Sequence, residues 1–198
     1  MGNSEHSRSL AVATAERLFR QQGYSATGLA QIIAESGSPK GSFYYLFPDG
    51  KAELALQVLD RYSAAGASFL KHAGKDRPND AGHYIRAVCA GLGAEMAQSG
   101  CQLGCDMANI AMDKAFEEPA LAARLKAGFT QWQEALASQL STRGLSATEA
   151  DRLAAALLAA LEGARTLARV QGSAAPFEAV ADLFTNMVDA RHPPGRST

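Results

Sequence analysis

Two short helical patterns follow each other near the N-terminus with only a glycine-containing turn between them. Thr27 is a suitable N-cap for the first pattern, and Gly37 ends it. The second pattern begins with Ser38 as its cap and Pro39 at its first helical position, and it continues to Pro48. Two short helices joined by a turn of about three or four residues form a helix-turn-helix. The pattern therefore predicts this motif.

The rest of the chain also has the three- and four-residue spacing of apolar side chains that is typical of helices. β-branched residues are sparse, which favours helix over strand. Ser146, followed three residues later by Glu149, matches a capping box at the start of one helix. We predict an all-α fold of about nine helices, at residues 9–22, 27–37, 38–47, 51–69, 83–98, 106–114, 119–140, 147–170 and 177–191.

Composition and motifs exclude several classes of protein. The net charge of −1 is too balanced for a polybasic coat protein or a charged disordered tail. The longest apolar run, residues 153–161, is too short to span a bilayer. The three cysteines are an odd number, the four histidines are scattered, and no nucleotide-binding or catalytic motif is present. We therefore predict a soluble, cytoplasmic protein that is not an enzyme and uses no cofactor, metal or membrane.

The second short helix has a composition that suits contact with DNA. Lys40 and Ser42 lie in its first turn, where free N–H groups and the helix dipole attract phosphate. Gly41 leaves room for close approach, and the hydroxyls of Tyr44 and Tyr45 are donors for the DNA backbone. A helix of this size fits the major groove of B-DNA.

The aromatic residues of this helix also have a second interpretation, as the core of a small bundle. Phe43 and Phe47 are four residues apart on one face, and we expect both in the core. The adjacent Tyr44 and Tyr45 cannot both point inward. Residues 1–62 contain six basic and six acidic side chains, so DNA binding would depend on local placement of charge.

The run from Ala11 to Leu59 resembles the N-terminal domain of TetR-type transcriptional regulators. The sequence departs from the family pattern at Gly28, where Thr or Ser is common, and at Leu46, where His is common. Its longer turn through Asp49 and Gly50 is similar to that of the subgroup containing the LmrA and YxaF regulators. The matching residues are Leu18-Phe19, Gly23-Tyr24, Thr27, Ile33-Ala34, Gly37, Lys40-Gly41-Ser42-Phe43-Tyr44-Tyr45, Phe47-Pro48 and Lys51-Ala52-Glu53-Leu54.

The resemblance implies a DNA-binding domain at residues 1–50 and a helical ligand-binding and dimerisation domain at 51–191. The tail at 192–198 is rich in Pro, Gly and Ser, and we expect it to be disordered. It implies a repressor that a small apolar or aromatic inducer releases from a double-stranded DNA operator. Thr27 and Lys51 would then contact phosphate. The residues at or beside the major groove would be Ser38, Lys40, Gly41, Ser42, Tyr44 and Tyr45.

The resemblance also implies a ligand pocket among the C-terminal helices. Methionine and aromatic side chains, which adapt to irregular apolar ligands, concentrate at residues 96–132 around a helix break. Each of them alone is more often a core residue. Glu162 lies in an apolar run and needs a partner, either Arg165 or a polar group of a ligand. The candidate pocket residues are Phe69, Met96, Cys101, Met107, Ile110, Met112, Phe116, Phe129, Trp132 and Glu162.

A homodimer is a further implication of the resemblance. The last two predicted helices are rich in alanine and leucine, and each has an apolar stripe that suits an isologous four-helix interface, although ordinary core packing would produce the same pattern. The stripe residues are Leu153, Leu157, Leu161, Ala164, Ala168, Phe177, Val180, Phe184 and Val188.

Cys101 and Cys105 are four residues apart and allow three interpretations: packing at the helix break, redox sensing or a soft metal site. Zinc would need further cysteine or histidine ligands, and none is close in sequence. Packing is the favoured interpretation. Two rival functions remain: the same scaffold triggered by cysteine oxidation, and a helical ligand-binding protein whose DNA-binding motif no longer works.

Overall fold

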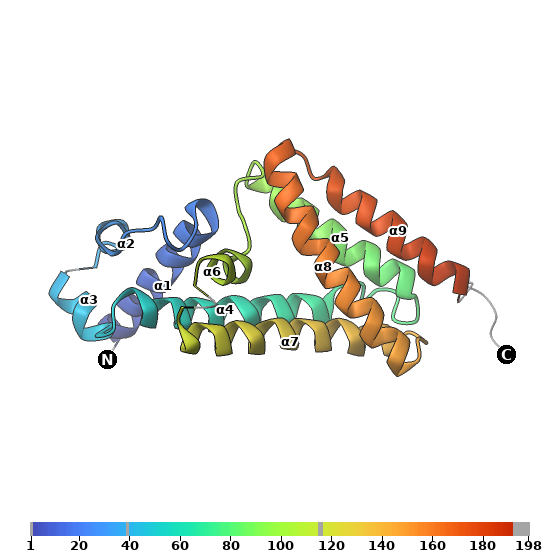
Figure 1. Ribbon diagram of the computed structural model, residues 1–198, viewed down its shortest axis with the longest axis horizontal. Helices are drawn as coiled ribbons and strands as arrows, with labels where there is room; N and C mark the ends of the chain where they lie inside the picture. Colours follow the sequence, from blue (N-terminus) through green and yellow to red (C-terminus); the bar gives the residue numbers. More distant parts are fainter. Residues whose placement is uncertain (1, 39, 115–116, 192–198) are drawn as a thin grey trace. The chain divides into compact units, whose positions relative to one another are not determined.

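The computed structural model describes residues 2–38, 40–114 and 117–191, where it contains nine α-helices and no strand (Figure 1). This confirms the all-α prediction. Pro39, Phe116 and the predicted tail at 192–198 lie outside the described residues. In the described ranges, no helix is long and apolar enough to cross a membrane. The helices are α1 (Gly2–Gln22), α2 (Leu29–Ser36), α3 (Lys40–Leu46), α4 (Lys51–His72), α5 (Ala81–Gln98), α6 (Asp106–Lys114), α7 (Pro119–Ser141), α8 (Ala147–Gln171) and α9 (Ala175–Arg191).

Helix ends agree with the caps predicted at Ser146 and Gly37. The Ser146 side chain accepts a hydrogen bond from the Glu149 backbone N–H, which completes the predicted capping box of α8. Gly37 ends α2 in the left-handed conformation, with φ 66°. The prediction that Thr27 caps the second helix is wrong, because Gly28 occupies that position without a side-chain hydrogen bond. α1 begins at Gly2, earlier than predicted. Its first turns are mostly exposed and carry no apolar stripe, so apolar periodicity did not reveal them.

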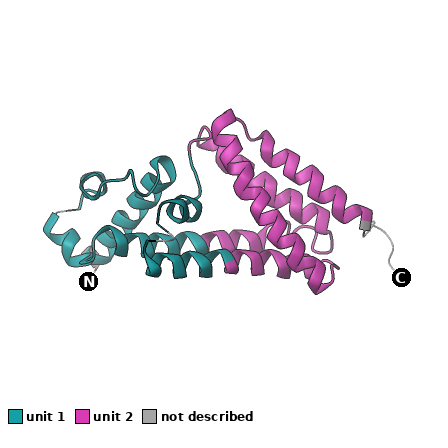
Figure 2. Cartoon of the chain, viewed as in Figure 1, with its two compact units in different colours: residues 1–64, 103–129 teal, residues 65–102, 130–198 magenta. Residues whose placement is uncertain are grey.

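The chain divides into two compact units (Figure 2). The first contains Met1–Ala64 and Leu103–Phe129, and the second contains Ala65–Gln102 and Thr130–Thr198. α6 therefore belongs to the same unit as α1, α2 and α3, although many residues separate them in sequence. α4 and α7 each contribute residues to both units.

The core of the first unit is aromatic. Phe19 of α1 and Phe43 of α3 are fully buried, as is Phe47, which directly follows α3. The ring centroids of Phe43 and Phe47 are 5.0 Å apart, so the prediction that both lie in the core is confirmed. Ile32 of α2 and Leu54 of α4 are also fully buried, so α1 to α4 all contribute to this core.

The core of the second unit forms where α5, α8 and α9 pack against one another (Figure 1). Tyr84 of α5, Leu157 of α8 and Phe177 of α9 are buried there. The Tyr84 hydroxyl donates to the Leu70 carbonyl at 3.0 Å, and the Arg143 guanidinium lies 4.6 Å from the centre of its ring. The phenol therefore keeps a hydrogen-bond partner in an apolar surrounding, as buried tyrosines require.

Candidate nucleic-acid interface

α3 has one buried side and one exposed side. Phe43 and Leu46 are buried against the first unit, whereas Lys40, Ser42 and Tyr45 are exposed. Tyr45 is 85% exposed, which is unusual for so large a side chain without a partner. A short helix that buries its apolar side and leaves a cation and several hydroxyls free has the form of a DNA-reading helix.

Six of the predicted interface residues lie at α3 or at the start of α4. Lys40, Gly41, Ser42, Tyr44 and Tyr45 form the exposed face of α3. The Lys51 ammonium lies 4.2 Å from the centre of the Tyr24 ring, and its pKa is lowered chiefly by partial burial. The structure therefore brings together the five α3 residues, and it places Lys51 half-buried at the start of α4.

Two of the predicted contacts, Thr27 and Ser38, are buried. The Thr27 hydroxyl donates to the Gly23 carbonyl at 2.7 Å and accepts from Gln22 Nε2 at 3.2 Å. Its observed role is to hold the turn between α1 and α2, because it pairs with a carbonyl just past the end of α1.

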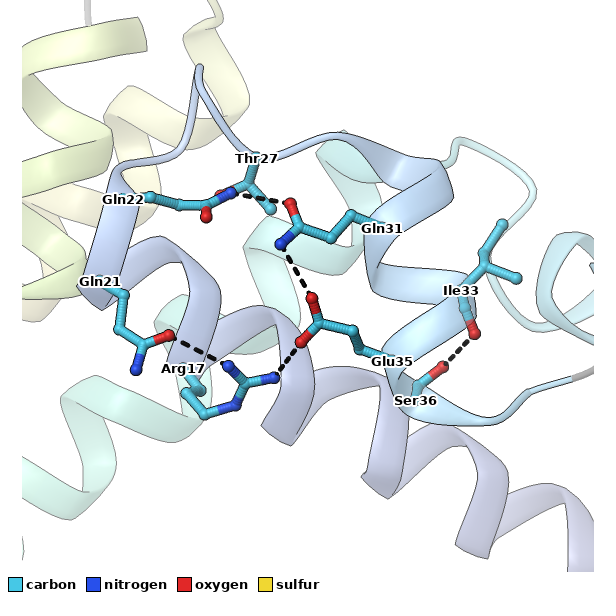
Figure 3. Close-up of polar contacts among 8 residues, drawn as sticks. All are labelled: Arg17, Gln21, Gln22, Thr27, Gln31, Ile33, Glu35 and Ser36. Carbon is cyan, nitrogen blue, oxygen red and sulfur yellow. Dashed lines mark hydrogen bonds and ion pairs between the residues drawn. The ribbon is translucent and has the colours of Figure 1, made fainter.

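A network of exposed polar side chains fixes α2 against α1 (Figure 3). Glu35 accepts from Arg17 Nη2 at 2.5 Å and from Gln31 Nε2 at 2.9 Å. Gln22 Nε2 donates to Gln31 Oε1 at 2.9 Å, which connects the network to Thr27. The hydrogen bonds from Arg17 and Gln31 lower the pKa of the Glu35 carboxyl. This network was not predicted from the sequence, although the i,i+4 spacing of Gln31 and Glu35 on a helix indicates a possible hydrogen bond between their side chains.

The segment before and within α6 caps the end of α1. Arg20 and Gly104 form a reciprocal pair, with Arg20 Nε donating to the Gly104 carbonyl at 2.9 Å and Gly104 N donating to the Arg20 carbonyl at 2.8 Å. Asn109 Nδ2 donates to the Phe19 carbonyl at 2.8 Å, and Asp113 accepts from Ser25 N at 2.7 Å. Two carbonyls in the last turn of α1 thus accept hydrogen bonds from a distant segment, and the Phe19 carbonyl also accepts from Gly23 N.

The predicted pocket residues are divided between the two units. Met107, Ile110, Met112 and Phe129 belong to the first unit, and Met107 and Ile110 are fully buried there. Met112 is 87% exposed. Phe116 lies outside the described residues.

The second unit contains the other pocket candidates, namely Phe69, Met96, Cys101, Trp132 and Glu162. The Phe69 ring lies across Gly91, and the Trp132 ring lies across Gly66. A β-carbon at either glycine would come within 2.7 Å of the ring, so both aromatic side chains depend on a glycine for their position.

The remaining polar candidates of the second unit are placed as follows. Arg165 is buried and donates to Glu95 at 3.1 Å, which gives that guanidinium a carboxylate partner. Cys101 is buried, with φ 60°, at the break between α5 and α6. Cys89 and Cys105 are buried as well. Within the described residues, no group of three or more His, Cys, Asp or Glu side chains could hold a metal ion.

Most of the predicted interface stripe is covered by its own chain. Leu157, Leu161, Ala164, Ala168, Phe177, Phe184 and Val188 are buried within one copy, and Leu153 and Val180 are partly exposed. A different set of apolar side chains is exposed on the same two helices: Leu167 and Val170 of α8, and Leu183 and Met187 of α9.

Family comparisons agree with this arrangement. The sequence profile described as bacterial regulatory proteins of the tetR family matches residues 11–58. The profile described as the C-terminal domain of LmrA/YxaF-like transcriptional regulators matches residues 81–183. The chain is 31% identical to the HTH-type transcriptional regulator YxaF of Bacillus subtilis, over 92% of this chain and 95% of YxaF. It is 26% identical to LmrA of the same organism, over 92% of this chain and 96% of LmrA.

Solved structures have the same fold. A regulatory protein from Rhodobacter sphaeroides superposes with a TM-score of 0.82 at 24% identity, covering 91% of this chain and 97% of that one. The reduced form of NemR from Escherichia coli superposes with a TM-score of 0.76 at 23% identity, covering 91% of this chain and 96% of NemR.

Proposed function

The chain belongs to the TetR family of bacterial transcriptional regulators, with an LmrA/YxaF-like C-terminal domain, and from this premise we propose that it is a repressor released from its operator by a small apolar or aromatic molecule. The observation that carries the proposal is the exposed face of α3, where Lys40, Ser42 and Tyr45 stand free of the core. These side chains can donate hydrogen bonds, and acceptor atoms of the DNA backbone and of the base edges can accept them.

DNA recognition in this proposal depends on local placement of charge. The first 62 residues carry equal numbers of basic and acidic side chains, so a general electrostatic field does not supply affinity. Lys40 reads a base edge or a phosphate at the major groove, with Tyr44 and Tyr45 beside it. Lys51 supplies a cation at the start of α4, and its contact with Tyr24 keeps that side chain ordered.

We assign the second subunit to the exposed apolar face of α8 and α9, formed by Leu167, Val170, Leu183 and Met187. The residues are spaced by three on α8 and by four on α9, so each pair lies on one side of its helix. Exposed apolar side chains of this kind favour burial against a partner. A second copy of the same face forms an isologous interface, and two linked reading helices then meet two half-sites about 34–36 Å apart or a multiple of that.

The inducer site is proposed in the second unit around Phe69, Met96 and Trp132. The Trp132 ring lies across Gly66 and the Phe69 ring lies across Gly91, so each ring packs against a position that has no side chain. A ligand can therefore displace either ring without a clash with a β-carbon at that glycine. The ligand must bind the released state of the protein more tightly than the DNA-bound state, because a ligand with equal affinity for both states would not change their populations. Operator DNA must then weaken ligand binding by the same factor.

The first experiment is selection of genomic fragments by the purified protein, followed by titration of the recovered fragment. We expect one or a few palindromic sites that bind far more tightly than random DNA at the same salt concentration. A protein that binds no fragment preferentially, at low as well as at physiological salt, would contradict the proposal and favour the rival function without DNA binding.

The second experiment uses Trp132, the only tryptophan of the chain, as a reporter of the inducer. A library of small apolar compounds is screened for release of the operator. Compounds that release it should change the fluorescence of Trp132 over the same range of concentrations. Trp132→Ala should bind operator with unchanged affinity and respond weakly or not at all to those compounds. A variant that keeps the wild-type response, or that loses operator binding while remaining folded, would place the inducer elsewhere.

A further inference from the structure

A groove lies between the first turns of α1 and the exposed side of α3. Its volume is about 460 Å³. The groove is open to solvent and shares residues with the proposed reading face of α3. The lining residues are Ser4 and Ser7 of α1 and Gly41, Ser42, Tyr45 and Leu46 of α3.

The lining of this groove suits an anion. Four of the six residues carry a hydroxyl, and none carries a carboxylate. Serine and tyrosine hydroxyls are among the common donors to DNA phosphate oxygens. Ser4 also lies in the first turn of α1, where backbone N–H groups lack partners within the helix and the helix dipole is positive.

A second groove along α1 has a mixed, charge-balanced lining. It has a volume of about 500 Å³ and is lined by Glu5 and Asp60 together with Arg8, Arg61 and three uncharged residues. Its two carboxylates offset its two guanidinium groups, so this groove offers a phosphate backbone no net attraction. Of the two grooves, the one between α1 and α3 is the one without a carboxylate in its lining.

Arg8 holds the hydroxyl-lined groove in a fixed form. Its Nη2 donates to the Leu46 carbonyl at 3.0 Å, and its guanidinium lies 5.1 Å from the centre of the Phe47 ring. Leu46 and Phe47 are both buried, so this contact ties α1 to the core end of α3. A cation at the C-terminal end of a helix is also favoured by the helix dipole.

We propose that this groove binds the sugar–phosphate backbone of the operator beside the major groove that α3 enters. Ser4 and Ser7 then contact phosphate from one wall, Tyr45 contacts it from the other, and Arg8 positions the two walls without contacting DNA itself. The proposal rests on the DNA-binding function proposed above, and it adds α1 to the elements that recognise the operator.

The test compares Ser7 with Ser9, which lies on α1 and lines the other groove. Ser7→Glu should weaken operator binding by about tenfold or more, because a carboxylate would face phosphate. Ser7→Lys should strengthen binding and steepen the dependence of log affinity on log salt by about 1. Ser9→Glu and Ser9→Lys should change affinity by about twofold or less, because that side chain faces away from the groove. Thermal unfolding of all four variants checks that each is folded.

The outcomes separate this proposal from the proposed function. Ser7 variants that behave like the Ser9 variants would overturn the groove assignment while operator binding stands. Equal effects at both positions would also overturn it, because they would reflect net charge rather than contact. A wild-type protein without operator binding would instead overturn the function itself.

A second measurement tests the positioning role of Arg8. Arg8→Ala should weaken operator binding and leave the salt dependence unchanged, and Arg8→Lys should restore part of the affinity. A salt slope that falls by about 1 in Arg8→Ala would mean that Arg8 contacts phosphate directly, which would overturn its assignment as a positioning residue.

Discussion

Neighbouring side chains of α3 lie in opposite environments. Phe43 is fully buried, and Tyr45, two residues later, is 85% exposed. The helical turn of about 100° per residue directs such neighbours to different sides, so a short helix can join a core and present a reading face at once. The consequences of single substitutions therefore depend on the side of the helix that they alter.

Lys40→Ala should impair DNA recognition and leave the fold intact, because the side chain is exposed. If Lys40 reads a base, operator affinity should fall by about 1–3 kcal/mol, with relaxed specificity at one position. If Lys40 contacts phosphate, affinity should fall for all DNA sequences, and the slope of log affinity against log salt should become shallower by about 1. Fluorescence anisotropy with operator and mutated operator distinguishes these results.

Lys75→Ala, at another exposed lysine, is the matched control for Lys40→Ala and should bind operator as the wild type does. A folded Lys40→Ala protein with the affinity and specificity of the control would remove Lys40 from the interface.

Alkaline pH should destabilise the protein through its buried thiol. Burial raises the pKa of Cys89 to about 12, whereas an unfolded chain releases this proton near pH 8.5. The stabilising contribution is therefore complete below about pH 8.5 and is lost as pH rises towards about 12, by at most about 1.4 kcal/mol per pH unit. Urea unfolding of Cys89→Ala should show a shallower decline than wild type above pH 9. Parallel pH profiles of the two proteins would contradict this linkage.

At the scale of elements, the helix-turn-helix is held by polar contacts at its edges as well as by its core. Arg17 and Glu35 join α1 to α2, and Asn109 and Asp113 join α6 to the end of α1 and the following turn. The first pair is exposed on the surface, so its contribution to stability is small. The pair joins α1, which has 21 residues, to the eight-residue α2, and the hydrogen bond from Gln22 to Gln31 is a further polar connection between them.

The pair between Arg17 and Glu35 should show a measurable but modest coupling. In a double-mutant cycle with alanine, the coupling in the free energy of unfolding should be small and favourable, and it should fall in 1 M salt because of screening. Arg17→Ala combined with Glu178→Ala, on α9, serves as the additive control. Additivity of Arg17→Ala and Glu35→Ala at low salt would show that the ion pair contributes nothing to stability.

At the scale of the whole molecule, two compact units share the continuous helices α4 and α7. α4 carries Lys51 in the first unit and Phe69 in the second. We propose that α4 transmits the inducer signal, since one helix contains both a proposed DNA contact and a proposed ligand contact. The proposed dimer would add a geometric condition, because two reading helices would have to match two half-sites at a set spacing.

Val170→Glu should produce monomers and abolish tight operator binding together. Val170 is 82% exposed in one chain, so a charge there costs the monomer fold little but is expensive in a buried interface. Sedimentation at micromolar concentration and operator titration measure the two effects. Arg152→Glu, at an exposed site near the start of α8, should remain dimeric. A Val170→Glu dimer, or a monomeric wild type, would contradict the proposed interface.

Most helices of this protein could be predicted from the amino-acid sequence, because the signals for helices are local. Capping residues, helix-ending glycines and apolar periodicity act within a few residues, so α6 and the capping box at Ser146 were predicted at their observed positions. The proposed role of α3 in reading DNA was predicted from the same local patterns, together with the impossibility of burying two adjacent tyrosines. The family resemblance was carried by residues of this one segment.

Which side of each later helix is covered follows from how the helices pack, and local sequence patterns do not reveal it. The stripe containing Leu157 was predicted as an interface, yet its own chain buries it, and Val170 is left exposed on the same helix. Periodicity identifies an apolar face without identifying what covers it, because a core and a subunit interface bury similar side chains. The contacts of Glu35 with Arg17 and of Asn109 with the end of α1 likewise depend on the packing of separate helices. No local pattern specifies that packing, because the two partners meet only once the chain has folded.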